Sequence, residues 1–277
     1  MRGIRIRYTA RGSYALPNLH FMKYLQTYQH WVALLLAVFI AGCAGTQEYD
    51  ETRNWTAAKF YSEAKASMQA GNYEQAIKHH ESLESRFPHG RYAQQAQLEV
   101  AYAYYKYDEP DSAIAAIDRF LKINPLHPYV DYAMYLKGLV NFNRGVGFLD
   151  RWLEDTYSKR DQQAARQAFR DFESLLKKFP DSRYSNDARQ RLVYLRNTLA
   201  MYEVHVAEYY MKREAYVAAA NRARQVVQNY QGTPALPEAL IIMIKAYQAL
   251  EMNNLAEDAK RVLVRNYPDR ATDLDAK

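Results

Sequence analysis

Small and apolar residues recur along this chain at the spacing of paired helices. An alanine followed twelve residues later by a proline marks four separate segments of the chain, and a fifth segment keeps the spacing with Gln231 in place of the proline. Alanine lets two packed helices approach closely, and proline ends a helix because it has no amide N–H and disfavours helical geometry in the preceding residue. We therefore predict five helix pairs, marked by Ala76 and Pro88, Ala113 and Pro125, Ala168 and Pro180, Ala219 and Gln231, and Ala256 and Pro268.

The first copy has the internal spacing of the tetratricopeptide repeat, which is roughly 34 residues long. Ala64 and Gly71 supply small residues where two helices meet, Tyr73 follows at the turn, and Pro88 closes the second helix. A period of roughly 20 to 50 residues indicates a solenoid, in which each repeat buries its apolar face only against its neighbours. The predicted fold is therefore all-α, a tetratricopeptide-repeat superhelix of five helix pairs.

Two junctions between repeats are longer than the template requires, because the five alanines are separated by 37, 55, 51 and 37 residues. The extra residues of the first long junction, 144–160, contain two glycines, which predicts an insertion loop. The second, Asn186 to Lys212, lacks Gly and Pro and repeats leucine at helical steps, which predicts one long helix. The expected order is front repeats over 56–143 (repeats 1 and 2 and the first helix of repeat 3), the loop, the second helix of repeat 3 within 161–184, the long helix with repeats 4 and 5 over 185–270, and a C-terminal tail over 271–277.

The N-terminal segment has the order of a secretory signal. Lys23 precedes an unbroken apolar run of eleven residues from Trp31 to Ala41, which is too short to span a bilayer as a helix. The tetrapeptide Ile40-Ala41-Gly42-Cys43 then resembles a bacterial lipobox, in which the cysteine is acylated and the peptide before it is removed. A buried cysteine after an apolar segment is the alternative.

These features predict how the mature protein is processed. Residues 1–42 form the signal peptide, with 1–21 as a start-site extension, and residues 43–55 form a lipidated, flexible stalk. Cys43 is expected to carry a diacylglycerol and an N-acyl chain, and no other cofactor is expected. Ala44 follows, where an aspartate would argue for the inner membrane, so we expect anchoring in the lipid of the outer membrane, on its periplasmic face.

Removal of the signal peptide changes the charge balance. Five cations and no acids are lost, which leaves 37 − 5 = 32 Lys and Arg against 31 Asp and Glu. The basic pI of 9.1 therefore mostly describes the discarded segment. We expect no nucleic-acid partner.

The first helix of each pair lines the concave side of a tetratricopeptide superhelix. Template positions on these helices carry tyrosine, phenylalanine and lysine, a combination that suits an extended peptide with aromatic side chains and a carboxylate. The alternative is that the tyrosines pack between repeats. The predicted lining is Tyr61, Lys65, Gln69, Leu98, Tyr102, Tyr105, Lys106, Tyr132, Tyr135, Phe142 and Asn143.

Few residues suggest chemistry. The chain has no Gly-rich phosphate loop, no His-Glu-x-x-His zinc motif and no Gly-x-Ser-x-Gly nucleophile motif. His79 and His80 are adjacent and point to different faces of a helix, so we expect no metal site. We predict a non-catalytic protein, and a lipoprotein hydrolase whose Ser, His and Asp meet from distant positions is the alternative.

Three stretches are similar to known proteins: Ala101-Tyr102-Ala103-Tyr104-Tyr105-Lys106, Ala116-Ile117-Asp118-Arg119-Phe120 with the following Asn124-Pro125, His127-Pro128 and Asp131-Tyr132, and Val206-Ala207-Glu208-Tyr209-Tyr210. They resemble the BamD (ComL) family of outer-membrane assembly lipoproteins from Gram-negative bacteria. The likeness extends from Cys43 to about Asp269 and is weakest in residues 144–160. It implies a non-catalytic subunit of the β-barrel assembly machine. Another envelope tetratricopeptide-repeat lipoprotein, such as one that coordinates cell-wall synthesis, would share the anchor and the repeats without these stretches.

The resemblance also implies partners. In this family the front repeats receive the C-terminal strand signal of unfolded barrel proteins. An aromatic residue before the first repeat's proline, here Phe87 and often tyrosine in relatives, is associated with that recognition. The back repeats dock the periplasmic domain of BamA through an arginine that corresponds to Arg222. BamC and BamE are the other expected lipoprotein partners, and the alternative for Arg222 is a solvated cation on a helix face.

Overall fold

The computed structural model describes residues 50–144 and 162–274. The chain divides into residues 1–54 and a helical unit from Trp55 to Lys277. The predictions for the signal peptide, for Cys43 and for all of the insertion loop except Arg144 lie outside the described residues.

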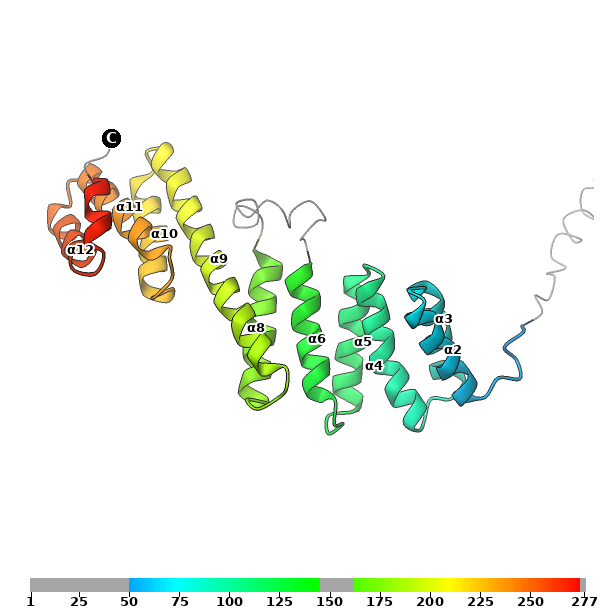
Figure 1. Ribbon diagram of the computed structural model, residues 1–277. Helices are drawn as coiled ribbons and strands as arrows, with labels where there is room; N and C mark the ends of the chain where they lie inside the picture. The colour runs from blue at the N-terminus through cyan, green and yellow to red at the C-terminus, as the bar shows by residue number, and fades with distance from the viewer. Residues whose placement is uncertain (1–49, 145–161, 275–277) are drawn as a thin grey trace, which may run out of the picture. The chain divides into compact units, whose positions relative to one another are not determined.

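The helical unit is a succession of helix pairs (Figure 1). Within the described ranges the chain forms ten α-helices, a C-terminal 3₁₀ segment and no strand, which confirms the predicted all-α fold. The helices of each pair pack on one another, and each second helix also packs on the first helix of the next pair. The pairs are α2 (Ala57–Gln69) with α3 (Tyr73–Arg86), α4 (Arg91–Lys106) with α5 (Pro110–Ile123), α6 (Val130–Asn143) with α8 (Gln163–Lys178), α9 (Ser185–Lys212) with α10 (Tyr216–Asn229), and α11 (Leu236–Ala249) with α12 (Asn253–Asn266), followed by η2 (Pro268–Leu274).

The repeated alanines belong to the buried cores of this stack. Ala76, Ala113, Ala168 and Ala219 are completely buried, and Ala256 is almost so. Because helix interfaces are close-packed, a side chain larger than a methyl group at these positions would force neighbouring helices apart. The five-pair tetratricopeptide architecture therefore follows directly from the alanine spacing.

The predicted closing positions coincide with the ends of the second helices. Four of these helices end two residues before a proline, and the residue that precedes the proline has φ between −122° and −140°. The ψ of these residues, between 57° and 67°, lies outside the α region, which a following proline disfavours. α10 ends in the same way at Asn229 although Gln231 replaces the proline, and Gly232 then turns the chain with φ of 75°, a value that glycine adopts at little cost.

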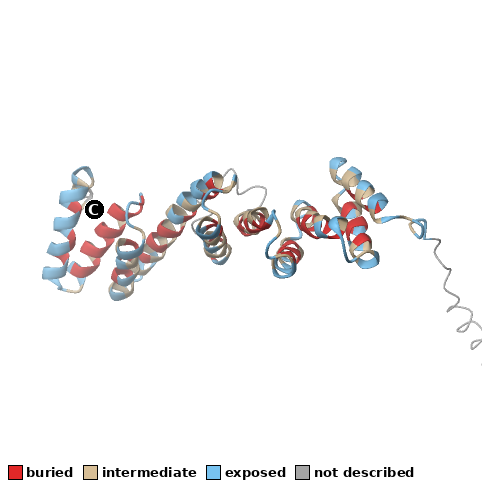
Figure 2. Ribbon diagram, turned by 90° about the horizontal axis from the view of Figure 1, so that it is seen from below, coloured by how far each residue is buried: buried red, intermediate tan, exposed pale blue. Residues whose placement is uncertain are grey.

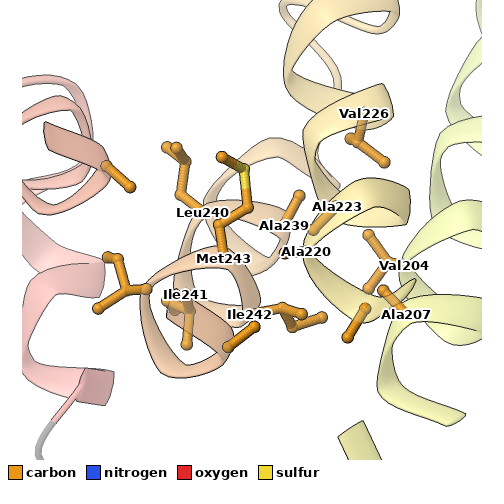
Figure 3. Close-up of a cluster of buried hydrophobic side chains, with 14 of the residues drawn as sticks. Val204, Ala207, Ala220, Ala223, Val226, Ala239, Leu240, Ile241, Ile242 and Met243 are labelled. Atoms are coloured by element: carbon orange, nitrogen blue, oxygen red, sulfur yellow. The ribbon is translucent and has the colours of Figure 1, made fainter. Parts of the chain in front are cut away.

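α9 covers the segment for which the sequence predicts one long helix. Its first half contributes Leu195 and Leu199 to the core built with α6 and α8. Its second half contributes Val204 and Ala207 to the core built with α10 and α11 (Figure 3). One continuous helix therefore belongs to two cores, and it couples the front repeats to the back repeats.

The two helices of the last repeat differ in burial. Ten of the fourteen residues of α11 are buried, whereas α12 buries three of fourteen, and Figure 2 shows the contrast. A helix packed between neighbours on two sides is apolar nearly all round, and a helix at the end of a stack keeps a polar outer face. None of the described helices is long and apolar enough to cross a membrane.

One contact in the third repeat leaves no room for a side chain. A Cβ atom added at Gly138 on α6 would lie 2.5 Å from Cε1 of Phe172, a completely buried ring on α8. Glycine at this position therefore permits α6 and α8 to pack together.

We predict that Gly138→Ala destabilises the protein by about 1–2 kcal/mol. The overpacking cost, up to about 3 kcal/mol, exceeds the gain of about 1 kcal/mol that alanine brings to a helix interior. Urea denaturation followed by circular dichroism measures the change. Phe172→Leu in the same chain should remove part of the loss, and a stabilised Gly138→Ala variant would contradict the close contact.

Candidate functional site

The exposed faces of α2, α4 and α6 surround a pocket of about 510 Å³. This volume lies in the range of sites that bind small molecules or peptide side chains. Five residues of the predicted concave lining meet in it, namely Tyr61, Lys65, Leu98, Tyr102 and Tyr132. The remaining lining residues are Met68, Gln95, Glu99, His127, Tyr129 and Tyr184.

Helical spacing explains why these side chains share one surface. Tyr61, Lys65 and Met68 follow one another at steps of four and three along α2. On α4, Leu98, Glu99 and Tyr102 are related by the same steps, as is Gln95 before them. Residues three and four apart lie on one helix face, so two neighbouring first helices present two parallel rows of side chains to the pocket.

Two tyrosine pairs of matching geometry border the pocket. The rings of Tyr61 and Tyr92 lie 5.4 Å apart at 43°, and those of Tyr132 and Tyr184 lie 5.5 Å apart at the same angle. Tyr92 and Tyr184 occupy equivalent positions in the sequence motif Phe-Pro-x-x-Arg-Tyr, which occurs twice, 92 residues apart. The repeated motif therefore places a second ring beside a first-helix tyrosine in two separate repeats. All four tyrosines remain partly exposed, so their packing and their lining roles coexist.

Glu99 is the acidic group of the pocket wall. Its Oε1 atom accepts a hydrogen bond of 2.8 Å from the Tyr61 hydroxyl and lies 3.3 Å from Nζ of Lys65. Burial, together with the hydrogen bond to Glu99, raises the pKa of Tyr61, which stays protonated and donates. The carboxylate thus orders two of the predicted lining residues.

Other predicted lining residues lie beside the pocket. Tyr105 accepts a hydrogen bond of 2.5 Å from Nδ2 of Asn143, and Nζ of Lys106 lies 5.9 Å from the ring centre of Tyr73. Tyr135 stacks on Tyr184 with ring centres 4.7 Å apart, and burial together with the hydrogen bond from its hydroxyl to Asp187 raises its pKa to about 12. Tyr105 also lies beside a lining ring, since its ring centre is 6.2 Å from that of Tyr102.

Three further residues have other surroundings. Phe87 lies at the C-terminal end of α3, where its ring is 6.4 Å from that of Phe60 in the core of the first repeat. Phe142 packs against Phe172 with ring centres 6.4 Å apart. Gln69 is exposed near the end of α2. None of the three is among the residues that line the pocket.

Arg222 belongs to an ion-pair network around a buried carboxylate. Glu203 on α9 is completely buried, and its two oxygens accept hydrogen bonds from Arg222 on α10 at 2.9 Å and from Arg166 on α8 at 3.0 Å. A buried charge is tolerated only when it is paired and hydrogen-bonded. The network therefore holds three helices together and fixes the guanidinium of Arg222, whose side chain is 41% exposed, at the surface.

Glu99, Glu203 and Tyr184 are not among the site residues that the sequence predicts. Glu99 could have been found, because it lies three residues before Tyr102 on the same helix face. Tyr184 has a signal in the repeated motif. No sequence signal points to Glu203, since a single carboxylate in a helix is normally assigned to a solvated face.

His79 and His80 are both buried, and within the described ranges no group of three or more His, Cys, Asp or Glu side chains is arranged to hold a metal. Neither nitrogen of His80 has a hydrogen-bond partner among the described residues. Burial lowers the pKa of His80 to about 4. His80 is therefore a neutral core residue at neutral pH.

Comparison with known proteins places this architecture in a family. A family model described as "Outer membrane lipoprotein" (YfiO) matches residues 53–269. The chain belongs to this family. Outer membrane protein assembly factor BamD of Neisseria meningitidis serogroup B is 47% identical over 239 residues, which cover 86% of this chain and 90% of the relative. The protein of the same name from Neisseria gonorrhoeae is 46% identical over the same shares, and that from Vibrio cholerae is 35% identical over 86% of this chain and 98% of the relative.

Membership in the family confirms several predictions. The chain is an outer-membrane protein assembly factor of the YfiO and BamD family and is associated with the outer membrane. The relatives are named as assembly factors and this chain folds as a stack of helix pairs, so the chain is a non-catalytic scaffold and the hydrolase alternative is set aside.

We predict that His80 makes stability depend on pH. Its pKa falls from 6.5 in the unfolded chain to about 4 in the folded protein, so below pH 6.5 the unfolded state binds more protons and stability falls as the pH approaches 4. The full effect is roughly 3 kcal/mol. His80→Leu should remove this drop and keep stability at pH 7, as measured by urea denaturation of both proteins between pH 7 and 4. Parallel curves for the two proteins would show that His80 does not resist protonation.

Proposed function

We propose that this chain is a subunit of the outer-membrane β-barrel assembly machine. Its front repeats bind the C-terminal strand of unfolded barrel proteins, and its back repeats dock the periplasmic domain of BamA, so that folding and insertion are promoted. The observation that carries the proposal is the tyrosine-lined pocket formed by three successive repeats. A cell-wall scaffold with the same repeats is not favoured by any comparable feature.

The pocket has the chemistry that an extended aromatic peptide requires. Tyr102 and Tyr132 offer apolar ring surface, and their partly exposed rings would gain by being covered. Gln95 and Glu99 offer hydrogen-bonding groups between the rings. A strand presents alternate side chains to one side, so it can place aromatic groups in the pocket while its backbone bonds to polar neighbours.

A lipid anchor would keep this pocket close to the membrane. We propose that Cys43 carries a diacylglycerol and an N-acyl chain and that these enter the lipid of the outer membrane on its periplasmic face. The chain from Cys43 to Thr56, the N-cap of α2, can extend over at most about 45 Å. Substrates in the periplasm would then meet the pocket near the site of insertion.

The back repeats offer a preorganised cation for a partner. Glu203 holds one nitrogen of Arg222 while much of the side chain stays exposed. Binding costs less when a side chain is already fixed in place, and arginine is frequent among residues that dominate interfaces. We propose that Arg222 contacts the periplasmic domain of BamA, with BamC and BamE as further partners of the complex.

We predict that Tyr102→Ala and Tyr132→Ala each weaken the binding of a peptide that copies the final strand of a porin. Removal of a ring from the centre of an interface costs at least about 1 kcal/mol, or roughly a fivefold loss of affinity. Fluorescence anisotropy with a labelled peptide measures the change. Tyr209→Ala, which removes an exposed ring from α9, is the matched control, and equal affinities for all four proteins would refute the pocket as the peptide site.

We predict that Arg222→Met reduces the affinity for the periplasmic domain of BamA about tenfold, which corresponds to roughly 1.4 kcal/mol. Arg224→Met, an exposed arginine on the same helix, should leave it unchanged. Affinity is measured by biolayer interferometry, with thermal unfolding as a check on Glu203 and its neighbours. Methionine is preferable to glutamate, because a carboxylate at position 222 would lie beside the buried Glu203. Equal losses for both variants would place the contact elsewhere.

A further inference from the structure

The pocket contains one cation and one anion. Among its lining residues only Lys65 and Glu99 carry a formal charge, so the lining is neutral when histidine is counted as neutral. Nζ of Lys65 lies 3.3 Å from Oε1 of Glu99, and the same oxygen accepts the Tyr61 hydroxyl at 2.8 Å. Lys65 is therefore already paired before any ligand arrives.

At neutral pH, Lys65 is the cation that neutralises the carboxylate of Glu99. Oε2 of Glu99 is buried without a hydrogen-bond partner among the described residues, and it lies 3.7 Å from Nε2 of His80. Burial lowers the pKa of His80 to about 4, so this ring is neutral at neutral pH and supplies no second cation behind the carboxylate.

Two arginines lie near the pocket, each packed against the ring of a tyrosine that borders it. The guanidinium carbon of Arg91 is 4.9 Å from the ring centre of Tyr92, and that of Arg183 is 5.6 Å from the ring centre of Tyr184. Both arginines are exposed and neither lines the pocket. Solvent and salt screen exposed charges strongly, so the two arginines add little to the field of the Lys65–Glu99 pair inside the pocket.

This arrangement disfavours a carboxylate ligand. A peptide carboxylate that approached Lys65 would also approach the oxygens of Glu99, and like charges at such short range repel. A peptide segment without a charged end meets no such repulsion. The sequence predicts a ligand with aromatic side chains and a carboxylate. The charges of the pocket suit the aromatic side chains and disfavour the carboxylate.

We infer that Glu99 is a specificity-determining residue, which makes the pocket select an extended aromatic segment by its rings and not by a terminal carboxylate. This inference rests on the proposed peptide-binding function. It deepens that function, because the ligand is a strand of aromatic character whether or not its C-terminus is free within the pocket.

The test compares two peptides of one sequence, a final porin strand made as the free acid and as the C-terminal amide. Dissociation constants are measured by fluorescence anisotropy for the full-length protein, with the label at the peptide N-terminus. The unmodified protein should bind the amide at least as tightly as the acid. Glu99→Gln, which keeps the shape and removes the charge, should prefer the acid about tenfold because Lys65 becomes available.

Two further variants separate specificity from stability. Glu63→Gln removes the same charge from the exposed Lys59–Glu63 pair on α2, outside the pocket, and should leave the ratio of the two dissociation constants unchanged. Adding Lys65→Met to Glu99→Gln should abolish the preference for the acid. A loss of folding would weaken both peptides together, whereas the inference concerns their ratio.

The outcomes distinguish a failure of the role of Glu99 from a failure of the proposed peptide binding. If both peptides bind and the unmodified protein prefers the free acid tenfold, or if Glu99→Gln leaves the ratio unchanged, the role of Glu99 is overturned while peptide binding stands. If neither peptide binds any of the proteins, the proposed function fails and the role of Glu99 fails with it.

Discussion

Close contact between helices at small side chains is the constraint on which this structure depends. Ala76, Ala113, Ala168 and Ala219 have no exposed surface, and Gly138 meets the ring of Phe172 directly. No single helix pair encloses a core of ordinary size, so each pair is stabilised by the next. α9 extends this dependence, since its two halves belong to different cores. Properties of the front and back repeats are therefore linked through packing.

The same constraint creates the surface on which the pocket lies. A stack held together by alanines and buried aliphatic residues leaves the outer faces of its first helices available for other side chains. On α2, α4 and α6 these faces carry tyrosines that contact one another and still remain partly exposed. Tyr135 and Tyr105 contact the rings of Tyr184 and Tyr102 and are themselves hydrogen-bonded to Asp187 and Asn143. The pocket is consequently preformed, which lowers the entropic cost of ordering a bound strand.

Two carboxylates organise the charged groups of this molecule in different ways. Glu203 is completely buried and is compensated by two arginines from neighbouring helices, so its removal would leave cations that face an apolar core. Glu99 is half-buried, and it neutralises Lys65 on the wall of a pocket. In both places an acid fixes the position and the effective charge of a cation that would otherwise be mobile. The surface that a partner or a peptide meets is thereby set by residues lying behind it.

The amino-acid sequence by itself determined the helix pairs, their ends and the long α9, because alanine spacing, proline positions and helical period are local properties of the chain. It also indicated which tyrosines share a helix face, and five of the residues expected in the groove line the pocket. Only the tertiary structure decided that Tyr61 meets Glu99, 38 positions away, and that Arg222 meets Glu203. Helical period reports which residues lie on one face, but the partner of each face depends on how neighbouring helices cross, and that is set by the packing of the whole stack.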